Sequence, residues 1–99
     1  MMTKYEMREA VAKLCGVIDW QRCPDYPNDV VAARAAVLVC CEKDFEKFLF
    51  GFHLLKIVRV GERKQTWTAS KLAYYVAVAR ADQLCEALLR VKNVWEDGK

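Results

Sequence analysis

The stretch Phe52-His53-Leu54-Leu55-Lys56-Ile57-Val58-Arg59-Val60 decides the fold class, together with the polar run Gly61-Glu62-Arg63-Lys64-Gln65 that follows it. Read as a strand, it places the even-numbered residues from 52 to 58 on one face and the odd-numbered residues from 53 to 59 on the other. Strand-forming residues resume from Thr66 to Val78. The pattern predicts an antiparallel β-hairpin of residues 52–60 and 66–78. A competing interpretation is a helix capped at Ser70, whose stripe consists of Leu72, Tyr75, Val76 and Ala79.

A helix is predicted near the start of the chain, over about residues 4–15. Thr3 and Glu6 have the spacing of a capping box, in which each side chain bonds the backbone amide of the other residue. Met7, Val11 and Leu14 then recur at helical spacing, and Gly16 can adopt the left-handed conformation that ends a helix.

A second helix is predicted from Val30 to Cys41. Before it, residues 23–28 hold both prolines of the chain and form an extended connector, and Asn28 or Asp29 supplies the helix cap. Arg34 is the only charge in the helix, so its surface is apolar nearly all round and we expect it at the centre of the core. Residues 45–50 yield no prediction.

The last predicted element is an amphipathic helix over about residues 80–92, and Asn93 can act as its C-terminal stop. Its apolar face comprises Ala81, Leu84, Cys85, Leu88 and Val91. Residues 95–99 form a frayed tail in which Trp95 can fold back onto the core. The predicted fold is a single α+β domain over residues 1–99, with two N-terminal helices, an antiparallel β-hairpin and a C-terminal helix.

Composition places the chain among folded proteins of a reducing compartment. Hydrophobic residues make up 55% of the 99 residues and charged residues 29%, which favours one cooperative core. The five cysteines are odd in number and Cys40 is adjacent to Cys41, a poor basis for disulfide pairing. Because no apolar stretch resembles a signal peptide or a membrane span, we expect a cytoplasmic protein without membrane contact.

Basic and aromatic residues gather on the predicted hairpin and form a candidate site for an anionic ligand. Arg59, Arg63, Lys64 and Lys71 flank Trp67, and Lys56 lies on the first strand. Cations bind phosphate and an aromatic face stacks on a base, so the group is suited to a small nucleotide. A solvated turn with cross-strand packing explains the same residues without a ligand. The net charge of +3 gives little support to dedicated nucleic-acid binding.

Two further groups each have a functional and a structural interpretation. The connector residues Asp25, Tyr26, Asn28 and Asp29 include two carboxylates and an amide near a helix start that could orient a ligand or a water, but turn and cap chemistry accounts for them as well. The aromatic residues Phe48, Phe50 and Phe52 are more apolar than one face of a hairpin requires. They form either a subunit or partner interface or part of the core.

No catalytic, metal or cofactor site is predicted. His53 is the only histidine and has no nucleophile motif around it, so a side chain on the sheet face explains it better than catalysis. The cysteines offer no Cys-x-x-Cys pair for zinc, and Cys40, Cys41 and Cys85 are expected to pack as small core hydrophobes. No glycine-rich loop suited to phosphate is present. The chain is therefore predicted not to be an enzyme.

The order of segments along the chain resembles that of a known protein family. The first segments are the helix Arg-Glu-Ala-Val-Ala-Lys-Leu-Cys-Gly and the connector Pro24-Asp25-Tyr26-Pro27-Asn28-Asp29. An alanine-rich helix, a hairpin and the closing Ala87-Leu88-Leu89-Arg90 helix with Trp95 follow. The sequence resembles the phage ABA-sandwich domain family of small phage and prophage proteins.

The resemblance implies a mobile-element origin and α/β/α layering. It leads us to expect a non-enzymatic accessory protein that counteracts host antiviral defence. Such a protein would act either as a homo-oligomer that sequesters a small anionic nucleotide or by binding a host protein through its apolar face. Nucleic-acid binding by the basic hairpin and a purely structural interaction module are the alternatives.

Overall fold

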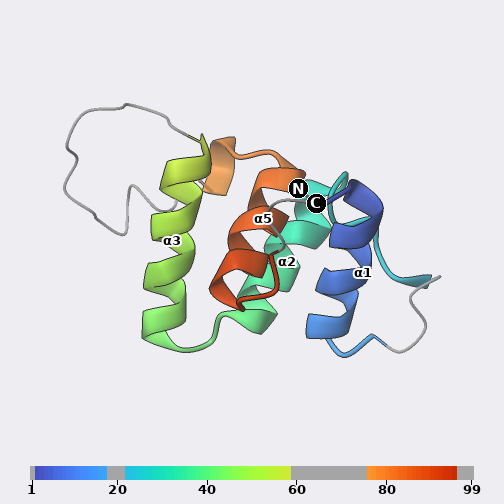
Figure 1. Cartoon of the computed structure of the whole chain (residues 1–99), viewed down its shortest axis with the longest axis horizontal. Coiled ribbons are helices and arrows are strands. Elements are labelled where there is room, and N and C mark those ends of the chain that lie inside the picture. Colours follow the sequence, from blue (N-terminus) through green and yellow to red (C-terminus); the bar gives the residue numbers. More distant parts are fainter. Residues whose placement is uncertain (1, 18–21, 59–75, 96–99) are drawn as a thin grey trace.

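The computed structural model describes residues 2–17, 22–58 and 76–95, and every regular element among them is a helix (Figure 1). The labelled helices are α1 (Lys4–Leu14), α2 (Val30–Cys40), α3 (Asp44–Val58) and α5 (Ala81–Val91). Residues 76–78 add one helical turn before α5. The described part of the chain is thus all-helical, and the predicted α+β class is wrong for it.

The predicted first strand of the hairpin is the second half of α3. Phe50 and Leu54 lie four residues apart and are both buried, as expected for one face of a helix. The strand pattern placed Phe52 on the same face as Leu54, yet Phe52 is 44% exposed and Leu54 is fully buried. The prediction was wrong because it relied on the strand propensity of aromatic and β-branched residues. The packing of α3 against α5 outweighs that propensity and stabilises a helix.

The rest of the hairpin is only partly covered by the structure. The polar turn 61–65 and most of the second strand lie outside the described residues, as do Ser70, Leu72 and Tyr75 of the competing helix. Residues 76–78, the end of the predicted second strand, are helical. The described residues therefore contain no β layer for the α/β/α arrangement that the resemblance implies.

Helix α5 lies at the centre of the fold. Figure 1 shows it between α3 and α1 with α2 behind, and it contacts all three helices. The predicted apolar face is confirmed at four of its positions, while Val91 is half-buried. Neighbours on several sides also bury two further residues of the helix. The buried residues of α5 are Ala81, Leu84, Cys85, Ala87, Leu88 and Leu89.

Helix α2 is not the centre of the core, contrary to the expectation from its composition. It buries Ala33, Ala36 and Cys40, whose small side chains allow close packing against α5. Three of its larger side chains point outward, with Val31 71%, Leu38 77% and Val39 59% exposed. A helix that is apolar all round therefore leaves an apolar surface uncovered here.

The predicted helix ends of α1 are confirmed. The Thr3 hydroxyl accepts a hydrogen bond from the Glu6 amide at 3.2 Å, and the Glu6 carboxylate accepts one from the Thr3 amide at 3.0 Å. Gly16 has φ +75°, the left-handed conformation expected after the helix. At the end of α5, Asn93 likewise has φ 60°.

The start of α3 is tied to the end of α5. The Glu46 carboxylate accepts from the Lys43 amide at 3.3 Å, and the same side chain forms an ion pair with Lys92. The hydrogen bond to Lys92 holds the pKa of Glu46 below its usual range, and the same bond raises the pKa of Lys92. This contact bridges residues far apart in the sequence and orients α3 along α5.

The cysteines are free and mostly buried, as predicted for Cys40, Cys41 and Cys85. Burial raises the pKa of Cys85 to about 12. Burial, and then the neighbouring Cys15, raise the pKa of Cys40 to about 12, and the two sulfur atoms lie 3.7 Å apart. These thiols are therefore neutral at physiological pH.

Thiol labelling is expected to report this burial. Because the thiolate is the reactive form, Cys40, Cys41 and Cys85 in the native protein should react with Ellman's reagent at least about 100-fold more slowly than in guanidinium chloride. The half-buried Cys15 should react first. Time-resolved absorbance with mass mapping of the labelled sites measures both. Rapid native labelling of all five cysteines would contradict the described core.

Candidate functional site

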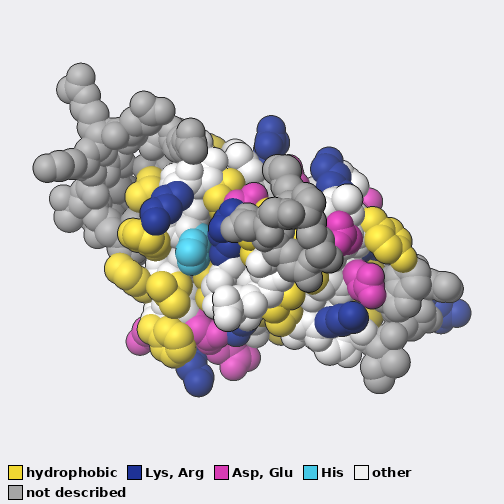
Figure 2. Space-filling view, viewed as in Figure 1, with side chains coloured by type: hydrophobic (Ala, Val, Ile, Leu, Met, Phe, Trp, Pro, Cys, Tyr) yellow, Lys and Arg dark blue, Asp and Glu magenta, His cyan; other side chains and the backbone are white. Residues whose placement is uncertain are grey.

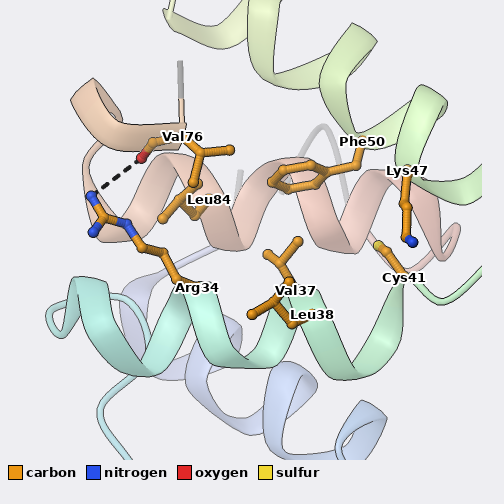
Figure 3. A pocket seen from close by; sticks show the side chains of 8 residues that line it. All are labelled: Arg34, Val37, Leu38, Cys41, Lys47, Phe50, Val76 and Leu84. Carbon is orange, nitrogen blue, oxygen red and sulfur yellow. Dashed lines mark hydrogen bonds between the residues drawn. The ribbon is translucent and has the colours of Figure 1, made fainter. Parts of the chain in front are cut away.

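A groove lies between α2, α3 and α5, closed on one side by the helical turn 76–78 (Figure 3). Its volume is about 280 Å³. Figure 3 shows Phe50 of α3 facing Val37 and Leu38 of α2 across the opening, with Leu84 of α5 beside Val76. The lining residues, which we call the groove, are Arg34, Val37, Leu38, Cys41, Lys47, Phe50, Val76 and Leu84.

Cationic side chains stand at the two ends of the groove. At one end a terminal nitrogen of Arg34 donates to the carbonyl oxygens of Val76 at 3.4 Å and Ala77 at 3.2 Å, which holds the turn 76–78 against α2. The Nε of Arg34 is buried and has no hydrogen-bond partner among the described residues. Lys47 lies at the other end, beside Cys41 (Figure 3). The groove thus combines an apolar floor with positive ends.

The outer side of α3 carries a second apolar feature, which we call the aromatic stripe. It consists of Phe45, Phe48, Leu49 and Phe52, exposed by 61%, 55%, 37% and 44%. This spacing places them on one helix face, opposite the buried Phe50 and Leu54. Figure 2 shows hydrophobic side chains gathered along the region of α3. Large exposed apolar groups in one row are typical of an interaction surface.

The three predicted interface residues divide between these two features. Phe48 and Phe52 belong to the aromatic stripe, whereas Phe50 is only 2% exposed and lines the groove. The sequence analysis treated the three as one apolar group because they belong to one continuous apolar run beside the predicted hairpin. In the helix Phe48 and Phe52 share a face, and Phe50 points to the opposite side.

The connector residues perform turn and cap chemistry. The Asp29 carboxylate accepts hydrogen bonds from the Val31 amide at 3.1 Å and the Ala32 amide at 3.2 Å. The Asn28 side chain donates to Asp25 at 3.0 Å and accepts from Lys4 at 2.9 Å. Tyr26 is buried, and burial raises its pKa to about 12. Residues 26–28 form a turn rather than the predicted extended segment.

Of the predicted basic site, the structure describes Lys56 alone. Arg59, Arg63, Lys64, Trp67 and Lys71 all lie outside the described residues. Lys56 is described, and its ammonium nitrogen lies 4.3 Å from the centre of the Phe52 ring. This cation–π contact keeps Lys56 at the end of the aromatic stripe.

His53 lines a separate polar pocket with Lys56, Ile57, Glu86 and Arg90. Burial lowers the pKa of His53, and the charges of Arg90 and Lys56 lower it further. Both causes disfavour the charged form of the imidazole. The Arg90 guanidinium is bonded to Glu86 at 2.9 Å and lies 5.2 Å from the Trp95 ring centre, which confirms that Trp95 folds back onto the core. None of the described residues that line this pocket is a serine or cysteine nucleophile.

The described residues contain neither a metal-binding cluster nor a membrane-spanning helix. Across 2–17, 22–58 and 76–95, no three His, Cys, Asp or Glu side chains gather where they could hold a metal ion. No helix in these ranges combines the length and the apolar character needed to cross a bilayer.

No family model, curated protein or solved structure matches the chain. The resemblance to phage accessory proteins therefore stays a prediction from the sequence. Sequence reasoning missed the groove, because its lining comes from α2, α3, α5 and a single helical turn. The one available signal was the excess of large apolar residues on α2 around Arg34.

Proposed function

We propose that the protein is a non-enzymatic binding protein that docks another protein in the groove. The observation that supports this is the apolar lining between α2 and α3, which ends in Arg34 and Lys47. Apolar grooves between helices accept the apolar face of a partner helix, and charges at the rim select its orientation. The partner we propose is a short helical segment with one large apolar side chain and an acidic neighbour.

The size of the groove favours a side chain over a larger ligand. Its volume of about 280 Å³ lies just below the range of about 300–1,000 Å³ that is typical of small-molecule sites. A leucine or phenylalanine anchor would occupy the space between Phe50 and Leu38. A carboxylate one helical turn away could then reach the Lys47 ammonium, which has no ion-pair partner among the described residues.

The other predicted mechanisms have less support in the described residues. Sequestration of an anionic nucleotide, and nucleic-acid binding, both depend on the basic group from Arg59 to Lys71, which lies outside them. The prediction that the partner is a host defence protein rests on the resemblance alone. A protein-binding groove is compatible with that prediction and does not require it.

A displayed library of helical peptides tests the groove directly. Selection against the native protein should enrich peptides with a leucine or phenylalanine anchor and acidic residues one turn away. The substitution Leu38→Glu should weaken binding of these peptides at least about 30-fold, because it places a negative charge at the groove opening and removes an apolar contact. Fluorescence polarisation of a labelled peptide measures the dissociation constant.

Val31→Glu is the matched control. Val31 lies on the same helix and is 71% exposed, close to the 77% of Leu38, but does not line the groove. Its substitution should leave peptide affinity within about twofold of the native value. Equal loss in both variants, or enrichment of peptides that bind Leu38→Glu as well as the native protein, would contradict docking in the groove.

A further inference from the structure

The aromatic stripe lies on the side of α3 that faces away from the groove residue Phe50, so it offers a separate surface. Its members, Phe45, Phe48, Leu49 and Phe52, are spaced by three, one and three residues. This spacing reads the same in both directions along the helix. A second stripe laid antiparallel therefore presents the same pattern of side chains.

We propose that two copies of this chain pair through antiparallel α3 helices, with the aromatic stripe as a twofold-symmetric interface. In this arrangement Phe45 lies opposite the partner's Phe52, and Phe48 lies opposite the partner's Leu49. A twofold interface requires a surface that is complementary to itself, and the spacing of the stripe meets that requirement. Helices that pair along such a row bury alternating knobs in the facing holes.

Charge at the two ends of the stripe favours the antiparallel orientation. Glu42 and Asp44 are exposed at the beginning of α3 and outnumber the one cation between them, Lys43, whose ammonium lies 5.9 Å from the centre of the Phe45 ring. Lys56 is exposed at the other end, one turn beyond Phe52. Antiparallel pairing brings Lys56, which lies over Phe52, towards two acids, the partner's Glu42 and the partner's Asp44, and towards one cation, the partner's Lys43. A parallel pair would instead bring like charges together.

The area of the stripe predicts a weak dimer. Given the exposed fractions of its four side chains, each copy would contribute about 400 Å² of apolar surface. Two copies would then bury about 800 Å², below the about 1,200 Å² of a standard stable interface. We therefore expect a dissociation constant on the order of 100 µM. The groove remains open on each copy, so the dimer would present two docking sites.

Sedimentation velocity of the full chain tests the pairing. From about 10 µM to about 1 mM the average mass should rise from that of the 11.4 kDa monomer towards twice that value. Phe48→Glu should weaken pairing at least about 30-fold, so the average mass should stay close to that of the monomer up to about 100 µM and remain well below the native value at about 1 mM. If circular dichroism shows lost helicity in this variant, Phe52→Glu provides the same test one turn further along the stripe.

Matched variants separate this interface from other contacts. Val31→Glu adds the same charge on α2, outside the stripe, and should dimerise like the native protein. Lys56→Glu should weaken pairing about threefold to tenfold, and adding Glu42→Lys with Asp44→Lys should restore it. A native protein that stays monomeric at about 1 mM, or a Phe48→Glu variant that dimerises normally, would overturn the proposal.

Discussion

Leu54→Ala is expected to lower the free energy of unfolding by about 2–5 kcal/mol, whereas Phe52→Ala should change it by less than about 1 kcal/mol. Leu54 is fully buried in the packing of α3 on α5, so its truncation leaves a cavity. Phe52 is 44% exposed on the aromatic stripe, and its main described contacts are with Lys56 and the His53 ring. Urea denaturation followed by far-ultraviolet circular dichroism measures both variants.

The pair distinguishes a helix from a strand because the two residues are two positions apart. In a strand Phe52 and Leu54 share a face, so the two truncations should have similar effects. In a helix they lie about 160° apart. Similar losses of stability in the two variants would contradict the helical assignment of residues 52–58.

Leu84→Ala is expected to have the second large effect, and it acts on stability and binding together. Leu84 is fully buried on α5 and forms part of the groove. Its truncation should lower the free energy of unfolding by about 2–4 kcal/mol, through lost apolar burial and an added cavity. Because this cavity joins the groove, the variant should prefer a peptide with a larger anchor, such as tryptophan in place of leucine.

The two parts of this prediction are measured separately. Thermal and urea denaturation give the stability, and fluorescence polarisation at a temperature where the variant is folded gives the affinity for each peptide. Leu88→Ala is the control, since Leu88 is equally buried on α5 but does not line the groove. It should lose similar stability without a change in anchor preference. The same change of preference in both variants would contradict the assigned lining.

Local signals in the sequence predicted α1, α2 and α5 because those signals are contained within each element. The Thr3 and Glu6 pair, the Asp29 cap and the Asn93 stop all act within a few residues of the helix end that they define. Helix α3 has no comparable signal in its sequence. Its start depends on Lys43 and Glu46, and Glu46 is also held by Lys92 from the far end of the chain.

The groove could not be predicted for a related reason. Whether Phe50 or Phe52 is buried depends on the helical phase of α3, and a strand reading assigns both to one face. The exposure of Leu38 depends on which side of α2 packs against α5, and an all-round apolar helix gives no preference. Tertiary packing therefore decided both features, although the sequence did indicate an excess of apolar surface.

The most direct test of the docking groove is a nitrogen-15 nuclear magnetic resonance titration of the native protein with the tightest selected peptide. Docking predicts that the largest amide shifts cluster at the groove, from Val37 to Cys41 on α2, at Lys47 and Phe50 on α3, and at Val76 and Leu84. Shifts confined to the aromatic stripe or to α1, with these groove amides unchanged, would contradict the proposed function.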